Sequence, residues 1–223
     1  MQNILQNRQN LYKIVSEFLI DCFINGTYKP GDRIIESKIA NKLRISQGAV
    51  REAIRVLVEK GFLIYEPFKG ARFKEYSFED LEDCMRVRIE LEEIAIKWAI
   101  EKHNWKKFDV TYLENLFKKM LSYVEKKEYL KRTKKDQEFH RHLVIASGSE
   151  SLLNIWTKLS DYYWVYVWLF FDRFLDKSFL QEKSIRHQPI IEAIKCRDRK
   201  LLIKSLESHF INLRKFIKKN MKE

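Results

Sequence analysis

The sequence contains few of the residues from which disulfide-bonded, loop-rich or membrane-spanning proteins are built. Among its 223 residues are only three cysteines, three prolines and six glycines. Because the cysteines are odd in number and form no CxxC pair, we expect reduced thiols. The N-terminus lacks the apolar segment and cleavage site of a signal peptide. The most apolar run, residues 162–171, is about ten residues long and too short to cross a bilayer. We therefore expect a soluble cytoplasmic protein, rich in helix, with no membrane partner.

Positive charge is abundant but spread along the chain. Lys and Arg number 43 against 31 Asp and Glu, which gives a net charge of +12. A basic chain favours a polyanionic partner such as nucleic acid. However, residues 1–75 carry 13 basic and 8 acidic side chains, and residues 76–223 carry 30 and 23. Since both parts are basic, charge alone does not locate a DNA-binding surface.

The stretch from residue 45 to 61 has the pattern of one amphipathic helix. Ser46 is a good N-cap, and Gly61 suits the left-handed residue that ends a helix. Apolar residues at spacings of three and four lie on one face: Val50, Ile54, Leu57 and Val58. Polar residues lie on the opposite face: Gln47, Arg51 and Arg55. Because Arg can bond bidentately to guanine and Gln to adenine, this helix suits the major groove of DNA.

The neighbouring segments complete a DNA-binding arrangement. An apolar stripe predicts a first helix over residues 11–24, and a short helix is expected over residues 36–43. After the long helix, residues 62–65 and 71–73 read as two strands joined by a turn at residues 67–70. Helix, short helix, longer helix and hairpin is the order of a winged helix-turn-helix domain.

Residues 28–73 resemble the DNA-binding domain of GntR-type bacterial regulators. The positions that fit the family pattern are Pro30, Gly31, Glu36, Ala40, Ser46, Val50 to Ala53, Gly61 and Gly70. Gln47 replaces an Arg that is common there, and Gly48-Ala49 replace Thr-Pro, so the operator sequence does not carry over. The resemblance implies base contacts from Gln47 and Arg51. Its other implied DNA contacts are Lys38, Ser46, Gly48, Arg55, Lys69 and Gly70.

From residue 76 onward the sequence reads as helix throughout. We place a domain boundary near residue 75, so that residues 1–75 form the winged domain and residues 76–223 an all-helical bundle. Six helical segments are expected, over residues 78–102, 105–126, 128–147, 151–174, 177–196 and 198–221. Pro189 should kink the fifth segment or lie in the first turn of a helix. The fold class is thus mainly α, with a small β-hairpin wing.

Three histidines and an aspartate form a candidate metal site. Asp136 and His140 are four residues apart, so both project from one helix face. His187 and His209 lie on later helices. If these helices converge, one carboxylate and three imidazoles could hold Zn²⁺, Ni²⁺, Mn²⁺ or Fe²⁺. Spacing alone leaves open that they are separate surface or core histidines, because only the first pair is locally constrained.

This second half resembles the FCD ligand-sensing domain of the FadR-like branch of the GntR family. The matching features are Arg88 with Glu92, Asp136 with Phe139-His140, His187 with Ile190 and Ala193-Ile194, and a final His209. The resemblance implies that Asp136, His140, His187 and His209 bind one divalent transition metal, with zinc as the first choice. It places Arg88 in the pocket, clamping an effector carboxylate, rather than in an exposed ion pair with Glu92. Ser149 stands where the family often has Asn near the pocket.

The sequence and its family resemblance together predict a ligand-responsive transcription regulator. The resemblance implies a homodimer, expected to act as a repressor on a short palindromic operator. Its effector is expected to be a small carboxylate metabolite. One alternative is a metal-free sensor whose pocket binds an acyl-type ligand and is lined by the aromatic residues of the run 162–171. That run could instead belong to the core or to a dimer interface. A second is a metal-dependent hydrolase fused to a DNA-binding head, although no further carboxylate has the spacing of a general base.

Overall fold

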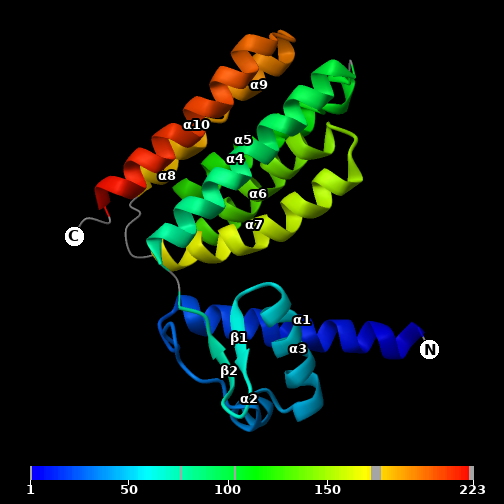
Figure 1. Cartoon of the computed structure of the whole chain (residues 1–223), viewed down its shortest axis with the longest axis vertical. Helices are drawn as coiled ribbons and strands as arrows, with labels where there is room; N and C mark the ends of the chain where they lie inside the picture. The colour runs from blue at the N-terminus through cyan, green and yellow to red at the C-terminus, as the bar shows by residue number, and fades with distance from the viewer. Residues whose placement is uncertain (1, 76, 103, 172–176, 221–223) are drawn as a thin grey trace. The chain divides into compact units, whose positions relative to one another are not determined.

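The computed structural model describes residues 2–75, 77–102, 104–171 and 177–220 (Figure 1). The chain divides into two compact units. One contains residues 1–77 and 164–172, and the other residues 78–163 and 173–223. Among the described residues, no helix is both long and apolar enough to cross a membrane.

The N-terminal unit is a winged helix-turn-helix, as predicted. Its helices are α1 (Gln2–Ile24), α2 (Glu36–Leu43) and α3 (Gln47–Glu59), and its strands are β1 (Leu63–Glu66) and β2 (Gly70–Phe73). The strands pair antiparallel, with Leu63 opposite Phe73 and Glu66 opposite Gly70. α1 begins nine residues before the predicted start at Leu11, because a polar segment without Pro or Gly continues the helix beyond the apolar stripe.

α3 forms for the reasons that its sequence indicates. The hydroxyl of Ser46 accepts a hydrogen bond from the Ala49 N–H at 3.2 Å and so caps the helix. Gly61, with φ of +75°, follows the helix end. The inner face packs against α1, α2 and the hairpin in a core that includes Val15, Leu19, Ile39, Val50, Ile54, Leu57 and Phe73. The outer face, with its polar residues, is left exposed.

The C-terminal unit is a bundle whose helices run side by side in Figure 1. The described elements after residue 77 are α4 (Phe78–Glu101), a 3₁₀ turn (Trp105–Lys107), α5 (Val110–Glu125), α6 (Tyr129–Ile145), α7 (Glu150–Phe171), α8 (Lys177–Ile185), α9 (Gln188–Lys195) and α10 (Arg199–Asn220). Of α7, only the part up to residue 163 belongs to this unit. The segment predicted as one helix over 177–196 is two helices. Pro189 lies in the first turn of α9, where its missing N–H removes no helical hydrogen bond.

The bundle core joins elements that are distant in sequence. Buried apolar side chains from α4, α5, α6, α9 and α10 form one cluster that includes Ile96, Leu113, Phe139, Leu143, Ile190, Leu202 and Leu206. This cluster fixes the inner faces of α6 and α10 and the start of α9 relative to one another. The polar residues described next lie among these apolar side chains.

Candidate metal centre

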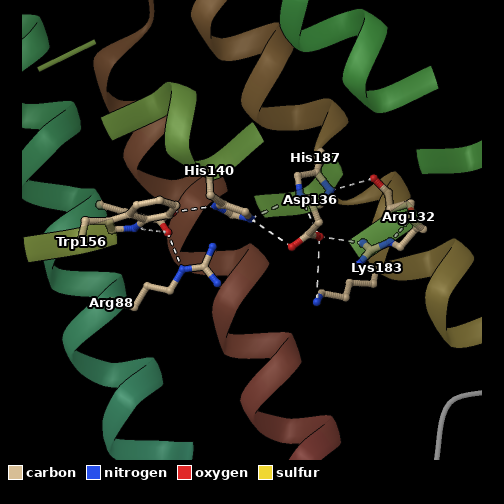
Figure 2. Close-up of polar contacts among 9 residues, drawn as sticks. Arg88, Arg132, Asp136, His140, Trp156, Lys183 and His187 are labelled. Carbon is tan, nitrogen blue, oxygen red and sulfur yellow. Dashed lines mark hydrogen bonds and ion pairs between the residues drawn. The ribbon is translucent and has the colours of Figure 1, made fainter. Parts of the chain in front are cut away.

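The bundle brings the three predicted histidines together. His140 comes from α6, His187 immediately precedes α9, and His209 comes from α10. All three are buried, and one ring nitrogen from each lies within 4.8 Å of the others. Asp136 is one helical turn before His140. Its Oδ1 lies 3.4 Å from His187 Nε2, and its Oδ2 lies 4.0 Å from His140 Nε2 (Figure 2).

Hydrogen bonds on the far side of two rings set their tautomers. His187 Nδ1 lies 3.0 Å from the Ser184 carbonyl oxygen, which can only accept, so we assign the proton to Nδ1. His140 Nδ1 lies 2.7 Å from Glu92 Oε2. Burial would raise the pKa of Glu92, but His140 and Arg88 outweigh burial and lower it, so the carboxylate is ionised and accepts. His187 Nε2 therefore carries a lone pair, and it lies 3.4 Å from His140 Nε2.

Burial keeps two of the imidazoles neutral. Desolvation lowers the pKa of His187 to about 3, even though Asp136 opposes the shift. Desolvation, followed by the other two histidines, lowers the pKa of His209 well below 6.5. His209 Nδ1 is also buried without a hydrogen-bond partner among the described residues. Neutral imidazole is the form that binds metal, so at neutral pH these rings are ready to act as ligands.

The dimensions of the cluster fit a transition metal. Zinc binds imidazole nitrogen at about 2.0–2.1 Å, so two nitrogens on a tetrahedral ion lie about 3.4 Å apart. The ring nitrogens here lie within 4.8 Å of one another, so the rings must close around a bound ion. Asp136 Oδ1, at 3.4 Å from His187 Nε2, would supply an anionic ligand beside them. The residues present therefore suit a divalent metal.

The carboxylate of Asp136 is held by two cations that the sequence did not single out. Arg132, one turn earlier on α6, places Nη2 at 2.8 Å from Asp136 Oδ1, and Lys183 Nζ lies at 3.9 Å. Burial would raise the pKa of Asp136, but Arg132 and then Lys183 outweigh burial and hold the pKa well below its usual 3.8. Arg132 Nε also donates to Ser184 Oγ at 3.1 Å. Arg132 thus links Asp136 to the residue whose carbonyl orients His187.

Arg88 is buried rather than exposed. Its Nε donates to Glu92 Oε1 at 2.8 Å, and its guanidinium lies 4.4 Å from the centre of the Tyr163 ring. Trp156 Nε1 donates to the same Glu92 oxygen at 3.0 Å. Figure 2 shows one polar chain running from Trp156 and Arg88 through His140 to Asp136 and Arg132. Sequence reasoning placed Arg88 correctly off the surface but missed that Glu92 connects it to His140.

Two further features were predicted for the pocket, Ser149 and the aromatic run at residues 162–171. Ser149 Oγ accepts from the Leu152 N–H at 3.2 Å, so this half-buried serine caps α7, and its contact with an effector stays a prediction. Of the aromatic run, only Tyr163 has a described side chain, which is buried. The side chains of residue 162 and residues 164–171 lie outside the described part, so their predicted role is not tested.

The predicted DNA contacts lie on the surface of the winged unit. Gln47, Arg51 and Arg55 are exposed on α3, and Lys38 is exposed on α2. Arg51 Nη2 lies 3.0 Å from Glu36 Oε2 while its side chain remains 65% exposed. On the wing, the Lys69 side chain is 79% exposed and Gly70 has φ of +84°. The fold displays these groups together; which of them contact DNA stays a prediction.

A winged helix-turn-helix followed by a helical bundle with a buried histidine site defines a ligand-sensing DNA-binding regulator. Comparison with known families agrees: residues 11–73 match "Bacterial regulatory proteins, gntR family", and residues 83–212 match "FCD domain". The chain belongs to the GntR family of transcription regulators with an FCD ligand-binding domain. Members bind DNA operators and a small-molecule effector, and FCD domains often bind metal. They are regulators and not enzymes, which removes the hydrolase alternative.

Individual relatives support the same class. The chain is 27% identical to the HTH-type transcriptional regulator YdhC of Bacillus subtilis (strain 168), over 83% of this chain and 81% of that protein. It is 27% identical to a probable D-xylose utilization operon transcriptional repressor of Paenarthrobacter nicotinovorans, over 87% and 83%. The solved structure of McbR/YncC from E. coli has the same fold, with a TM-score of 0.74, 22% identity and coverage of 94% and 98%.

Proposed function

We propose that the FCD bundle of this regulator binds one divalent transition metal through Asp136, His140, His187 and His209. Zinc is the first choice, with nickel, manganese or iron as alternatives. The observation that carries the proposal is the convergence of three buried imidazoles, whose ring nitrogens lie within 4.8 Å of one another, beside the ionised carboxylate of Asp136. A bound metal would supply the missing positive charge and coordination positions for an anion.

The effector is proposed to be a small carboxylate. The buried network holds three basic side chains, Arg88, Arg132 and Lys183, against two ionised carboxylates, Glu92 and Asp136. Desolvation lowers the pKa of Lys183 to about 7, so this lysine is only partly charged at neutral pH. Even so, a divalent cation would leave a clear excess of positive charge in a buried site. Such an excess favours an anionic ligand. Arg88, fixed by Glu92, is the proposed carboxylate partner, and Ser149 a second contact.

The winged unit is proposed to bind a short palindromic operator as part of a homodimer. In this proposal, Gln47 and Arg51 reach base edges, beside Ser46 and Gly48 at the helix start. Arg55 and Lys38 hold phosphates, and Lys69 with Gly70 enters the minor groove. Glu36 keeps the Arg51 guanidinium extended before DNA arrives. Effector binding alters repression only if the effector binds more tightly to the homodimer at one spacing of its two winged units than at another spacing.

The metal proposal is tested by elemental analysis of the purified, untagged protein. We expect about one transition metal per chain, because the four proposed ligands converge on a single position. The His187→Ala variant and the Asp136→Ala/His140→Ala variant should lose most of it. His142→Gln is the matched control, because His142 lies on α6 outside the cluster and accepts a hydrogen bond from the Asp109 N–H, which glutamine can also do. Equal metal content in wild type and the His187→Ala variant would refute the ligand assignment.

The DNA proposal is tested with Arg51→Ala. Its ion pair with Glu36 is exposed to solvent and therefore weak, so the variant should fold normally. Specific operator binding should fall by about 10- to 100-fold, as expected for a lost base contact. Arg86→Ala is the control, because Arg86 is equally exposed (63%) but lies on α4. Unchanged affinity in the Arg51→Ala variant would remove this residue from the reading surface.

A further inference from the structure

The tip of the wing carries an aromatic residue in a position that the turn disfavours. The Lys69 N–H donates to the Glu66 carbonyl at 3.1 Å, closing a four-residue turn with Pro67 second and Phe68 third. Phe68 has φ of +65°. Proline second and a positive φ third is the pattern of a type II turn, which favours glycine at the third position. A bulky side chain there costs free energy.

Packing within the winged unit does not offset the free-energy cost of this conformation. The Phe68 side chain is fully exposed, at 105% of its reference area, so it buries no apolar surface in the unit that carries it. A glycine would suit the turn better, and a polar residue would suit water better. Neither turn geometry nor packing therefore explains this residue. A single exposed aromatic is common on protein surfaces, but one held at a positive φ in a turn that favours glycine indicates a role in binding another molecule.

Several basic residues belong to the wing that carries Phe68. Lys69 follows Phe68 directly, and Arg72 lies on β2, two residues after Gly70. Arg33 pairs with Arg72 in an isolated bridge, and its guanidinium lies 3.9 Å from the position that a Cβ on Gly70 would occupy. Glu66 contacts both Lys69 and Arg72 and offsets part of this charge. An apolar tip flanked by cations matches the minor groove, where apolar side chains can enter between bases while cations contact the phosphates.

We propose that Phe68 is a wedge that enters the minor groove of bound DNA and partly unstacks one base step. The proposal rests on the proposed placement of the wing in the minor groove and adds a residue and a consequence to it. Pyrimidine–purine steps unstack most easily, so the wedge would favour operators with TA or CA/TG at the wing position. The wing would then contribute to sequence preference without a hydrogen bond to a base.

The test uses the full-length protein and a duplex that the wild type selects from a random pool. 2-Aminopurine is placed at successive positions of the duplex, because its fluorescence rises when it is unstacked. Wild type should raise the fluorescence at one step in each half-site, Phe68→Leu should retain this signal, and Phe68→Gly should lose it with at least a tenfold loss of affinity. The thermal midpoint of free Phe68→Gly should equal or exceed that of wild type, since the turn favours glycine.

Two further variants separate failure of the wedge from failure of the proposed function. Lys69→Gln should lower the salt dependence of binding by about one ion, whereas Phe68→Gly should leave it unchanged. One outcome is that Lys69→Gln lowers the salt dependence while Phe68→Gly binds DNA and unstacks the base step like wild type. In that case the wedge proposal is wrong, but the placement of the wing in the minor groove stands. If neither variant changes binding while Arg51→Ala weakens it as expected, the wing does not contact DNA and the wedge proposal is overturned with it.

Discussion

Replacing Glu92 by Gln should invert the tautomer of His140 and weaken metal binding. Glu92 Oε1 accepts from Arg88 Nε and Trp156 Nε1, so the amide oxygen of Gln must stay on that side. The amide NH₂ then faces His140 Nδ1, which becomes an acceptor and moves its proton to Nε2. An N–H would point at His187 Nε2, where the proposed metal needs a lone pair.

The size of the effect follows from the contacts that change. Loss of a partner that orients a metal-binding histidine typically costs 10- to 100-fold in metal affinity. Because the ligand nitrogen itself is protonated here, we expect the upper end, a loss of about 100-fold, or about 2.7 kcal/mol. The variant also removes one charge from a buried ion pair, which typically costs about 3–5 kcal/mol of stability. All three hydrogen bonds of this residue survive, one with its direction reversed, so we expect the lower end, about 3 kcal/mol.

The assay is competition with a chromophoric chelator at fixed pH, together with ¹⁵N chemical shifts of the histidine rings in the metal-free protein. Circular dichroism must first show that the variant is folded under the assay conditions. Glu93→Gln is the control. Its ion pair with Lys97 is partly exposed, and its loss should leave metal affinity unchanged. A folded Glu92→Gln variant whose metal affinity lies within about threefold of wild type would refute the tautomer argument, since it predicts about 100-fold.

Three smaller predictions concern helix ends. Ser46→Ala removes the cap of α3 and should lower the urea stability of the N-terminal unit by about 1 kcal/mol; no change would show that the cap is dispensable. Gly48→Ala should raise that stability by about 0.5–1 kcal/mol, because an added Cβ meets only Ser46 Oγ at 3.9 Å. Its operator affinity should nevertheless fall in a gel-shift assay, if the backbone at Gly48 approaches DNA. Ser149→Ala should destabilise the bundle by about 1 kcal/mol through loss of the α7 cap, with metal content by elemental analysis unchanged.

The N-terminal unit could be predicted closely because its signals are local. The N-cap at Ser46, the apolar spacing from Val50 to Leu57 and the hairpin turn each act within a few residues. The bounds of α2, Glu36–Leu43, agree with the prediction for the same reason. Prediction was poorer where a helix had no capping residue or apolar stripe to mark its start, as for α1. Prediction was also poorer at residues 177–196, because Pro189 is compatible both with one kinked helix and with the start of a second helix, as observed.

The site was predictable only in part, because its ligands are not local. Spacing joins Asp136 to His140, but no pattern in the sequence brings His187 and His209 to them; family resemblance suggested this, and bundle packing does it. The polar partners were missed although some follow helical spacing. Arg132 lies one turn before Asp136, and Glu92 was read only as a partner of Arg88. Its contact with His140 crosses 48 residues and cannot be read from either segment alone.

The buried polar network around Glu92 and Asp136 is not explained by a contribution to the stability of the bundle. Ionised carboxylates at Glu92 and Asp136 lie deep in an apolar bundle, and replacing such pairs with hydrophobic residues is often neutral or stabilising. His209 Nδ1 adds a buried polar atom with no hydrogen-bond partner among the described residues. A ligand that binds only the folded state stabilises it in proportion to its occupancy. A bundle whose interior is unfavourable when empty therefore responds strongly to what fills it, and that is the property a sensor domain needs to alter the DNA-binding unit.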